Sequence, residues 1–206
     1  MGRRKILNLE TKIFSAVIKM NAKEGISNIS TKLLAKKLGI SEPVFFSHFI
    51  TKQGLLNASF DYAWQQIYTY FGVPTSLMED NFSKGLEIYR EKNDVLLKEY
   101  PDEILYVFDY LNSCFVDMDH ADLLMKDTFD SLKYFFASSD PQLNADDLDI
   151  LCRQNIHLSL MYLVNIIRKR IVRSERSDAL YYTLRHNGYL ALLQTNLDAY
   201  KGAKSK

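Results

Sequence analysis

Residues able to bind a metal ion or to act in catalysis are scattered along this chain of 206 residues. No two of the four histidines, His48, His120, His157 and His186, have the i, i+4 spacing that places two ligands on one helix face. The sequence also has no glycine-rich phosphate loop, no nucleophile-elbow motif and no close set of cysteine and histidine. It therefore predicts a protein that is not an enzyme and needs no metal or cofactor. A catalytic site assembled only by folding stays open as an alternative.

Charge is distributed so that one end of the chain is suited to bind phosphate. Residues 1–56 hold ten Lys/Arg and three Asp/Glu, a balance of +7, whereas residues 57–206 hold 16 and 22, a balance of −6. A basic head on an acidic body indicates that the head alone meets nucleic acid. Arg3, Arg4 and Lys5 either extend this basic surface as an arm along a DNA groove or form a solubilising terminus.

Two short helices joined by a tight turn are predicted within this basic head. Ser30 is a suitable N-cap for the first helix, and Gly39 tolerates the left-handed backbone that often ends a helix. Ser41 is placed to cap the second helix, with Pro43 in its first turn. This pattern is typical of a helix-turn-helix, whose second helix enters the major groove of DNA. The apolar residues expected to form the core of this small domain are Leu33, Leu38, Ile40, Val44, Phe45 and Phe49.

Helical periodicity dominates the whole chain, so the predicted fold class is all-α. An N-terminal three-helix helix-turn-helix domain, residues 1–56, is expected to precede a larger helical ligand-binding and dimerisation domain, residues 57–206. Asn144 followed by Asp147 resembles a capping box. The ends, 1–5 and 201–206, are polar and expected to be mobile. Besides the helix-turn-helix pair, helices are expected over 9–24, 52–71, 77–99, 102–118, 119–137, 144–172 and 177–200.

The two cysteines, Cys114 and Cys152, fall within apolar helical patterns and are expected to be buried and reduced. Because the sequence shows no signal peptide and no run of apolar residues long enough for a membrane span, a cytoplasmic protein is expected.

The segment from Ser30 to Lys52 resembles the DNA-binding domain of the tetracycline-repressor (TetR) family. The resemblance lies in the Leu-Gly-Ile-Ser turn and in His48-Phe49 ahead of Lys52, and it covers about residues 9–60. It implies a homodimeric bacterial transcription regulator, usually a repressor, that binds palindromic operator DNA and releases it when a small ligand binds the C-terminal domain.

The resemblance also implies which residues contact DNA. Phe46 stands where the family usually has a tyrosine whose hydroxyl contacts phosphate, so its ring is left to pack against sugar or a thymine methyl. Glu42 is a second departure, and its carboxylate suits a cytosine amino group or a neighbouring lysine. The positions carried over as DNA contacts are Thr31, Lys32, Glu42, Pro43, Val44, Phe46, His48 and Lys52.

The body, residues 57–206, holds 22 of the 26 aromatic residues. Aromatic walls with a few polar groups suit a small apolar or aromatic ligand, and the family's ligand cavity is lined by these helices. Ordinary helical core is the alternative for each residue. The residues expected to include the pocket lining are Trp64, Tyr68, Tyr89, Tyr106, Phe108, Phe115 and His157.

Residues 158–167 are apolar on almost every side, as in a helix buried on two sides. The resemblance implies a four-helix dimer interface built from 144–172 and 177–200 of each subunit. Burial within one chain is the alternative. The cluster Arg168, Lys169, Arg170 and Arg173 is interpreted as charge at a helix C-terminus rather than as a second nucleic-acid patch. Leucines expected to contribute from the last helix are Leu180, Leu184, Leu190, Leu193 and Leu197.

A second rival function, besides an enzyme whose site is assembled by folding, remains open from the sequence. Because Phe46 and Glu42 depart from the family pattern, the chain could be an all-α sensor or carrier of a small molecule whose head no longer binds DNA.

Overall fold

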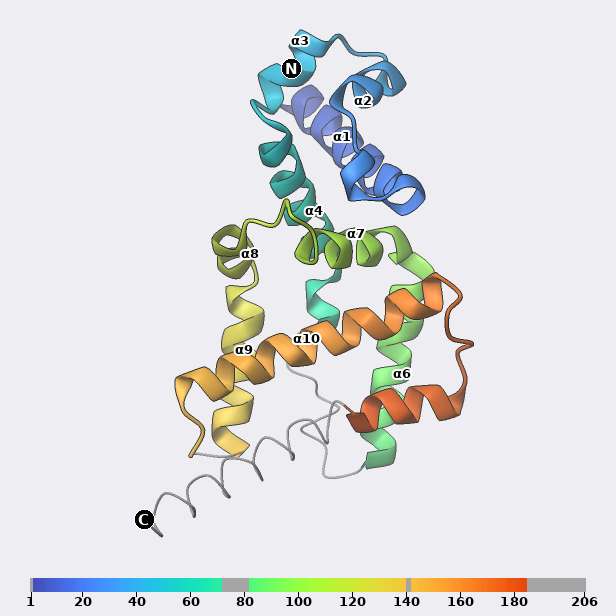
Figure 1. The fold of residues 1–206 in the computed structure, drawn as a ribbon, viewed down its shortest axis with the longest axis vertical. Helices are drawn as coiled ribbons and strands as arrows, with labels where there is room; N and C mark the ends of the chain where they lie inside the picture. The colour runs from blue at the N-terminus through green and yellow to red at the C-terminus, as the bar shows by residue number, and fades with distance from the viewer. Residues whose placement is uncertain (1, 72–81, 140–141, 185–206) are drawn as a thin grey trace. The chain divides into compact units, whose positions relative to one another are not determined.

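The computed structural model describes residues 2–71, 82–139 and 142–184. Every element assigned within these ranges is helical, so the all-α prediction is confirmed. None of the helices in the described ranges is long and apolar enough to cross a membrane. In chain order (Figure 1) the elements are α1 (Gly2–Glu24), the short 3-10 helix η1 (Ile26–Asn28), α2 (Thr31–Leu38), α3 (Glu42–His48), α4 (Lys52–Phe71), α6 (Phe82–Glu99), α7 (Pro101–Leu111), α8 (Met118–Leu124), α9 (Lys126–Ser139), α10 (Ala145–Ile167) and a final helix over 175–184.

The chain divides into two compact units. Unit 1 comprises Met1–Thr69 and Lys98–Met125, and unit 2 comprises Tyr70–Leu97 and Lys126–Lys206. The three N-terminal helices therefore share a unit with most of α4 and with α7 and α8. The boundary between residues 56 and 57, inferred from charge, stays a prediction.

The first helix begins earlier than its sequence suggested. α1 starts at Gly2 rather than near Leu9, so residues 2–5, expected to be an irregular end of the chain, are helical. Arginine, lysine and leucine are good helix formers, and nothing in this stretch breaks a helix. α1 ends at Glu24, and Gly25 follows with a φ of 81°.

The helix-turn-helix forms at the positions predicted from the capping residues of its two helices. The Leu33 N–H donates to Ser30 Oγ at 3.3 Å, and Gly39 takes the left-handed conformation with a φ of 68°. Ser41 occupies the N-cap position of α3, but its side chain makes no capping hydrogen bond, so that detail of the prediction is wrong. Its carbonyl instead accepts the first helical hydrogen bond, from the Phe45 N–H at 3.0 Å.

Only part of the predicted small-domain core is buried. Phe45 and Phe49 are inside, and they lie one turn apart on the inner side of the second helix. The prediction is wrong for Leu33 and Val44, which are each 44 % exposed. Seven- and eight-residue helices have only about two turns, so few positions can face inward. The buried apolar residues contributed by α1, η1, α2 and α4 include Ile13, Val17, Ile18, Ile26, Leu34, Leu55, Leu56 and Phe60.

Two of the predicted long helices are shorter or broken. The helix expected over 102–118 stops at Leu111, and the one expected over 119–137 is divided into α8 and α9. The Ser113 hydroxyl donates to Tyr110 O at 2.9 Å, and Asp117 caps α8 by accepting from the His120 N–H at 3.1 Å. Short polar side chains compete with helical backbone bonds in this way. Cys114 lies in the intervening loop and is exposed, so its predicted burial is wrong.

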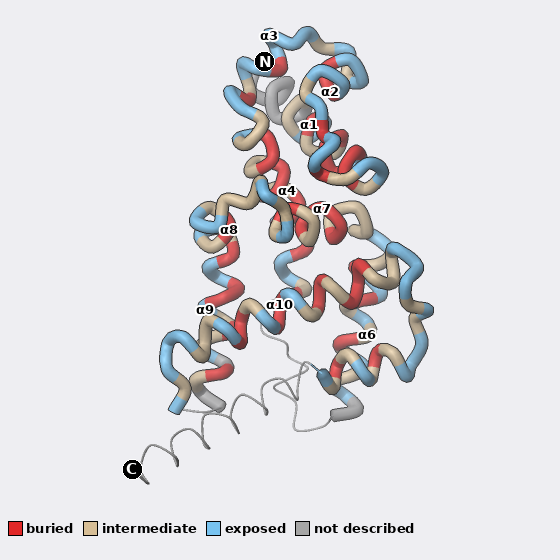
Figure 2. Tube along the Cα trace, in the orientation of Figure 1, coloured by how far each residue is buried: buried red, intermediate tan, exposed pale blue. Residues whose placement is uncertain are grey.

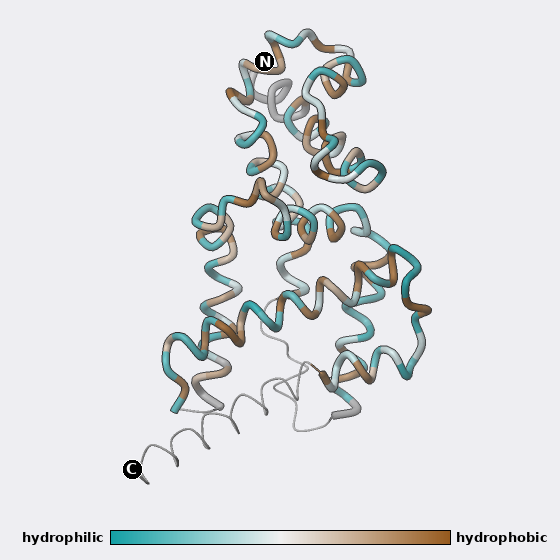
Figure 3. The backbone as a smooth tube through the Cα atoms, viewed as in Figure 1, coloured by the Kyte–Doolittle hydropathy of each residue, from teal (hydrophilic) through white to brown (hydrophobic). Residues whose placement is uncertain are grey.

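The capping box at the start of α10 is confirmed. Asn144 Oδ1 accepts from the Asp147 N–H at 3.0 Å, and Asp147 Oδ2 accepts from the Asn144 N–H at 3.1 Å. Hydrophobic and hydrophilic residues alternate along α10 (Figure 3). Cys152, on this helix, is buried, as predicted. α10 ends at Ile167, five residues earlier than expected, and Lys169 follows with a φ of 54°.

A charged cluster secures the helix of residues 175–184 within unit 2. Asp178 is only 2 % exposed, and its carboxylate accepts from Arg173 Nε at 3.1 Å, from Arg90 Nε at 3.2 Å and from the Tyr162 hydroxyl. Arg173 also pairs with Asp94. Arg173 is therefore a structural residue, and its assignment to the charged end of α10 is wrong.

Replacing Asp178 tests this cluster. Asp178→Ala leaves two guanidinium groups and a buried hydroxyl without their shared acceptor, and we expect the free energy of unfolding to fall by about 2–4 kcal/mol. Glu175→Ala is the matched control, because Glu175 pairs with the same Arg90 at 3.5 Å but its side chain is 85 % exposed. We expect that change to stay within about 0.5 kcal/mol. Urea denaturation followed by circular dichroism measures both, and equal losses would contradict the role given to Asp178.

The two thiols should differ in reactivity. Cys152 is fully buried beside the Phe129 carbonyl, and burial raises the pKa of its thiol to about 12. Because the thiolate is the reactive form, an aromatic disulfide reagent at neutral pH should label one thiol per native chain and two in denaturant. Cys114→Ser should abolish the native signal. Equal labelling rates for both thiols in the native protein would show that Cys152 is not enclosed.

Candidate nucleic-acid interface

The outer face of α3 is defined by the two residues that it buries. Phe45 is fully buried and Phe49, which ends the helix, is 8 % exposed. At 100° per residue, Pro43, Val44 and Ser47 lie on the opposite side, and all three are exposed. Figure 2 shows the exposed colour along most of this short helix. Almost the whole outer surface of α3 is therefore exposed.

Ser47 belongs to this face although it was not among the predicted contacts. Its hydroxyl donates to the Val44 carbonyl at 2.7 Å, so its proton is directed back along the helix. The signal that could have found it is its spacing, since it lies one turn beyond Pro43 on the side away from Phe45.

Glu42 and Phe46 form one flank of α3, again one turn apart. Both are exposed, and the Phe46 ring stands edge-on to Phe45 with 5.9 Å between ring centroids. No hydrogen bond or ion pair of the Glu42 carboxylate is found in the part of the chain that the structure describes. This flank offers a carboxylate and an aromatic ring, but no N–H donor.

α2 supplies the positive charge. Thr31 is the first residue of the helix and is half-buried, while Lys32 beside it is exposed. Lys36 and Lys37 are exposed on the last turn of the same helix. These flexible cations suit phosphate oxygens, which fix the position of a protein on DNA without reading its sequence.

His48 holds α3 to α1 in this structure. Its Nδ1 lies 3.3 Å from Glu10 Oε1, and the imidazole is mostly buried. The predicted DNA contact at His48 thus has a second role inside the domain, because it anchors the end of the helix that carries the outer face.

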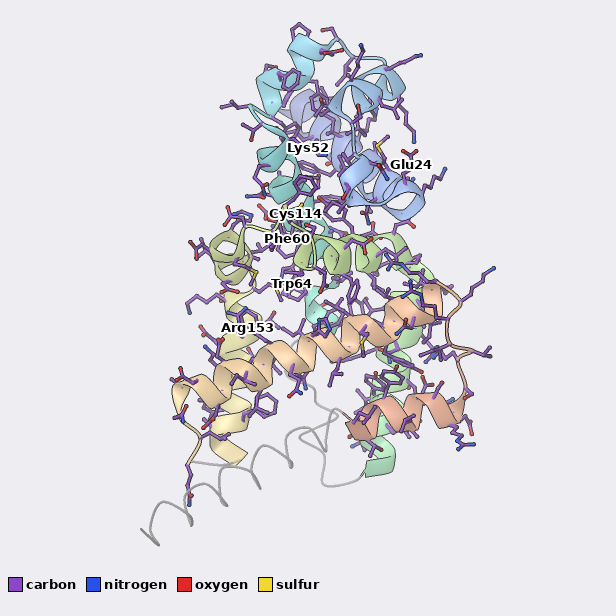
Figure 4. The ribbon with its side chains drawn as sticks, in the orientation of Figure 1. Glu24, Lys52, Phe60, Trp64, Cys114 and Arg153 are labelled. Atoms are coloured by element: carbon purple, nitrogen blue, oxygen red, sulfur yellow. The ribbon has the colours of Figure 1, made fainter. Side chains whose placement is uncertain are left out.

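Lys52 begins α4 (Figure 4) and contacts two other parts of unit 1. Its ammonium donates to the Ser27 carbonyl at 3.4 Å and lies 4.7 Å from the centroid of the Phe115 ring. A cation over an aromatic face is a favourable electrostatic contact. Phe115, predicted to line a ligand pocket, therefore lies against a predicted DNA contact.

A polar edge of α4 continues from Lys52 and was not recognised from the sequence. Gln53, Asn57 and Asp61 recur every fourth residue, so they line one side of the helix. All three bind the segment 115–120. The Gln53 amide donates to Phe115 O at 2.5 Å, the Asn57 amide donates to Asp117 Oδ2 at 3.3 Å, and Asp61 Oδ1 lies 2.6 Å from His120 Nε2.

The predicted pocket residues are distributed over both units. Trp64 and Tyr106 are buried in unit 1, where the Tyr106 hydroxyl donates to Leu56 O at 2.9 Å. Tyr89 is buried in unit 2, and its ring contacts those of Tyr162 and Tyr182. The side chains of the remaining four are half-buried at Phe108 and Phe115 and exposed at Tyr68 and His157. Tyr106 and Tyr89 serve as core residues here, and a pocket stays a prediction.

No group of three or more histidine, cysteine or acidic side chains is placed to hold a metal ion among the residues that the structure describes.

Comparisons with known proteins agree with this geometry. Residues 13–59 match the family model of bacterial regulatory proteins of the tetR family. No curated protein sequence matches the chain.

The fold recurs in solved structures of low sequence identity. A TetR family transcription regulator from Marinobacter aquaeolei VT8 is 16 % identical, with 89 % of this chain and 96 % of that chain covered and a TM-score of 0.64. BioQ with its natural double-stranded DNA operator is 17 % identical, with 90 % and 96 % covered and a TM-score of 0.53. Thermus thermophilus FadR in complex with lauroyl-CoA is 17 % identical, with 88 % and 93 % covered and a TM-score of 0.51.

At these identities the structural likeness establishes the fold, and the family model identifies the domain that carries α2 and α3. The family model thus assigns residues 13–59, which include α2 and α3, to the bacterial regulatory proteins of the tetR family.

Proposed function

We propose that this protein regulates transcription by binding palindromic operator DNA as a homodimer and that a small molecule modulates this binding. The observation that carries the proposal is the exposed outer face of α3 beside the lysines of α2, within the domain that matches the family model. We further propose that it acts as a repressor in the cytoplasm, as is usual for the family that it resembles.

The dimensions of the head support insertion into DNA. An α-helix with its side chains is about 10–12 Å across, and the major groove is about 12 Å wide. A helix of seven residues such as α3 is about 10 Å long. One such helix meets only a few base pairs, so useful specificity needs two heads. In a dimer the two recognition helices would lie about 34–36 Å apart, one turn of DNA.

Exposed leucines support the proposed dimer. Leu180 and Leu184 lie one turn apart on the helix of residues 175–184, and both are exposed. Ile150 is likewise exposed on α10. We propose that these side chains are covered by the second subunit. The other predicted interface leucines, Leu190, Leu193 and Leu197, lie outside the described residues.

A small apolar or aromatic ligand is proposed for the helical body. The FadR structure holds lauroyl-CoA, a ligand with an apolar acyl chain, in a protein of this fold. Here Phe108 and Phe115, both half-buried, supply aromatic surface in unit 1. Such a ligand changes DNA binding only to the extent that it binds the two conformations with different affinity.

A sensor that has lost DNA binding is the second candidate. The Lys52 ammonium rests on the Ser27 carbonyl and the Phe115 ring, and Phe46 has no hydroxyl to offer phosphate. On this view the basic head would show no salt-dependent retention on DNA, even at low ionic strength.

Replacing Lys52 tests the DNA-binding function. Lys52→Ala should weaken binding to all sequences alike and reduce the slope of log K against log[salt] by about one, because one phosphate contact is lost. Fluorescence anisotropy on DNA selected from a random pool measures the affinity at salt concentrations from about 50 to about 200 mM. Affinity that depends on phosphate contacts falls strongly over this range of salt concentration.

Lys98→Ala is the matched control for this experiment. Lys98 is an exposed lysine at the end of α6, paired with Glu99 at 3.0 Å and outside the helix-turn-helix. Its replacement removes the same charge and should leave the slope unchanged. An equal slope for wild type and Lys52→Ala would remove the phosphate role from Lys52, and a failure to select any DNA would favour the sensor.

Replacing the exposed leucines tests the dimer. Leu180→Asp with Leu184→Asp places two carboxylates in the proposed interface, and we expect sedimentation to shift from dimer to monomer. Operator affinity should fall by about a hundredfold or more, since the two heads no longer bind together. Leu123→Asp, at a leucine 73 % exposed on α8, is the control and should sediment as wild type. A monomeric wild type would refute the proposed interface.

A further inference from the structure

We propose that α3 reads thymine methyl groups and the amino groups of adenine or cytosine, and that it leaves guanine unread. Val44 is the residue assigned to the methyl contact. This inference rests on the proposed function, and it specifies the class of base that the outer face of α3 recognises.

The side chains on this face lack the donors that guanine requires. Guanine presents two acceptors, N7 and O6, in the major groove, and proteins read them with N–H donors, most often from arginine or lysine. Pro43 and Val44 carry no polar side-chain group, and the hydroxyl proton of Ser47 is directed to the Val44 carbonyl. The single nitrogen-bearing side chain of α3 is that of His48, which is mostly buried against Glu10.

The same face complements the other bases. Thymine presents its C5 methyl, whereas adenine and cytosine present amino donors at N6 and N4. The Val44 side chain is 44 % exposed and offers two methyl groups for apolar contact. The Glu42 carboxylate and the Ser47 oxygen are acceptors suited to an amino group. Phe46, 41 % exposed on the Glu42 flank, adds apolar surface.

Charge is separated from base recognition in this arrangement. Lys32, Lys36 and Lys37 are exposed on α2, whereas α3 carries no lysine or arginine. Their attraction to phosphate brings an otherwise uncharged or acidic helix face to the groove. Affinity would therefore come mainly from α2, while the choice of sequence would come from apolar and acceptor groups of α3.

Removing a single methyl group from DNA tests the assignment. A duplex selected from a random pool is resynthesised with each thymine replaced in turn by deoxyuridine, which keeps every hydrogen-bonding group and loses only the C5 methyl. At one thymine of a half-site, we expect wild-type affinity to fall about three- to fivefold, the effect of one buried methyl. Val44→Ala should bind the parent duplex more weakly and show less than about a twofold response at that thymine.

Val172→Ala provides the matched control, because Val172 is 90 % exposed and lies outside the helix-turn-helix. This variant should respond to deoxyuridine as wild type does. Circular dichroism melting checks that both valine variants remain folded. Replacing guanine by 7-deazaguanine, which lacks the N7 acceptor, should produce no loss that depends on α3.

Three outcomes overturn the proposal. The first is salt-dependent DNA binding with no thymine sensitive to deoxyuridine. The second is a sensitive thymine whose response is unchanged in Val44→Ala. The third is a 7-deazaguanine loss that disappears when Ser47 is replaced by alanine. All three leave DNA binding itself intact, so they are distinct from failure of the proposed function, which would appear as the absence of any selected DNA.

Discussion

The contact between α4 and two tyrosines of α7 is the interaction on which unit 1 depends. The Tyr106 hydroxyl donates to the Leu56 carbonyl, and the Tyr110 hydroxyl donates to Asn57 Oδ1, each at 2.9 Å. The Tyr110 ring also stacks on Phe60 with centroids 4.5 Å apart. Aromatic rings bury a large apolar area, and here their hydroxyls are satisfied as well. Since α4 begins only four residues after α3 ends, fixing α4 also constrains the helix proposed to enter DNA.

Shortness explains how α2 and α3 serve both stability and recognition. Helices of seven or eight residues are not stable alone in water, so they depend on the few side chains that they bury, chiefly Leu34, Phe45 and Phe49. The exposed positions of these helices, such as Lys32, Val44 and Ser47, are free of packing constraints. Val44, expected in the core, is exposed for this reason, and its exposure is what makes it available to a base.

Aromatic and charged residues of the body illustrate the limit of sequence reasoning about the candidate site. Phe115 was predicted to line a ligand pocket because it is aromatic, yet its ring packs against the Lys52 ammonium. Arg173 was predicted to be one of the charged residues at the C-terminus of a helix, yet it pairs with Asp178 and Asp94. Residue type was informative about the kind of contact each would make, a cation with a ring or a guanidinium with a carboxylate. It carried no information about the partner.

The sequence by itself determined the all-α class, the helix-turn-helix and its family, and the helix starts at Ser30 and Asn144. These features depend on groups within about four residues of one another, so capping residues and helix-ending glycines can be recognised from the sequence alone. Only the tertiary structure decided where α7 stops, which apolar residues of α3 face outward, and what holds the start of α4. Those outcomes depend on partners far apart in the chain, such as Asp61 and His120, 59 residues apart, or Arg173 and Asp94, 79 apart. Their proximity arises from the packing of whole helices, which no local pattern encodes.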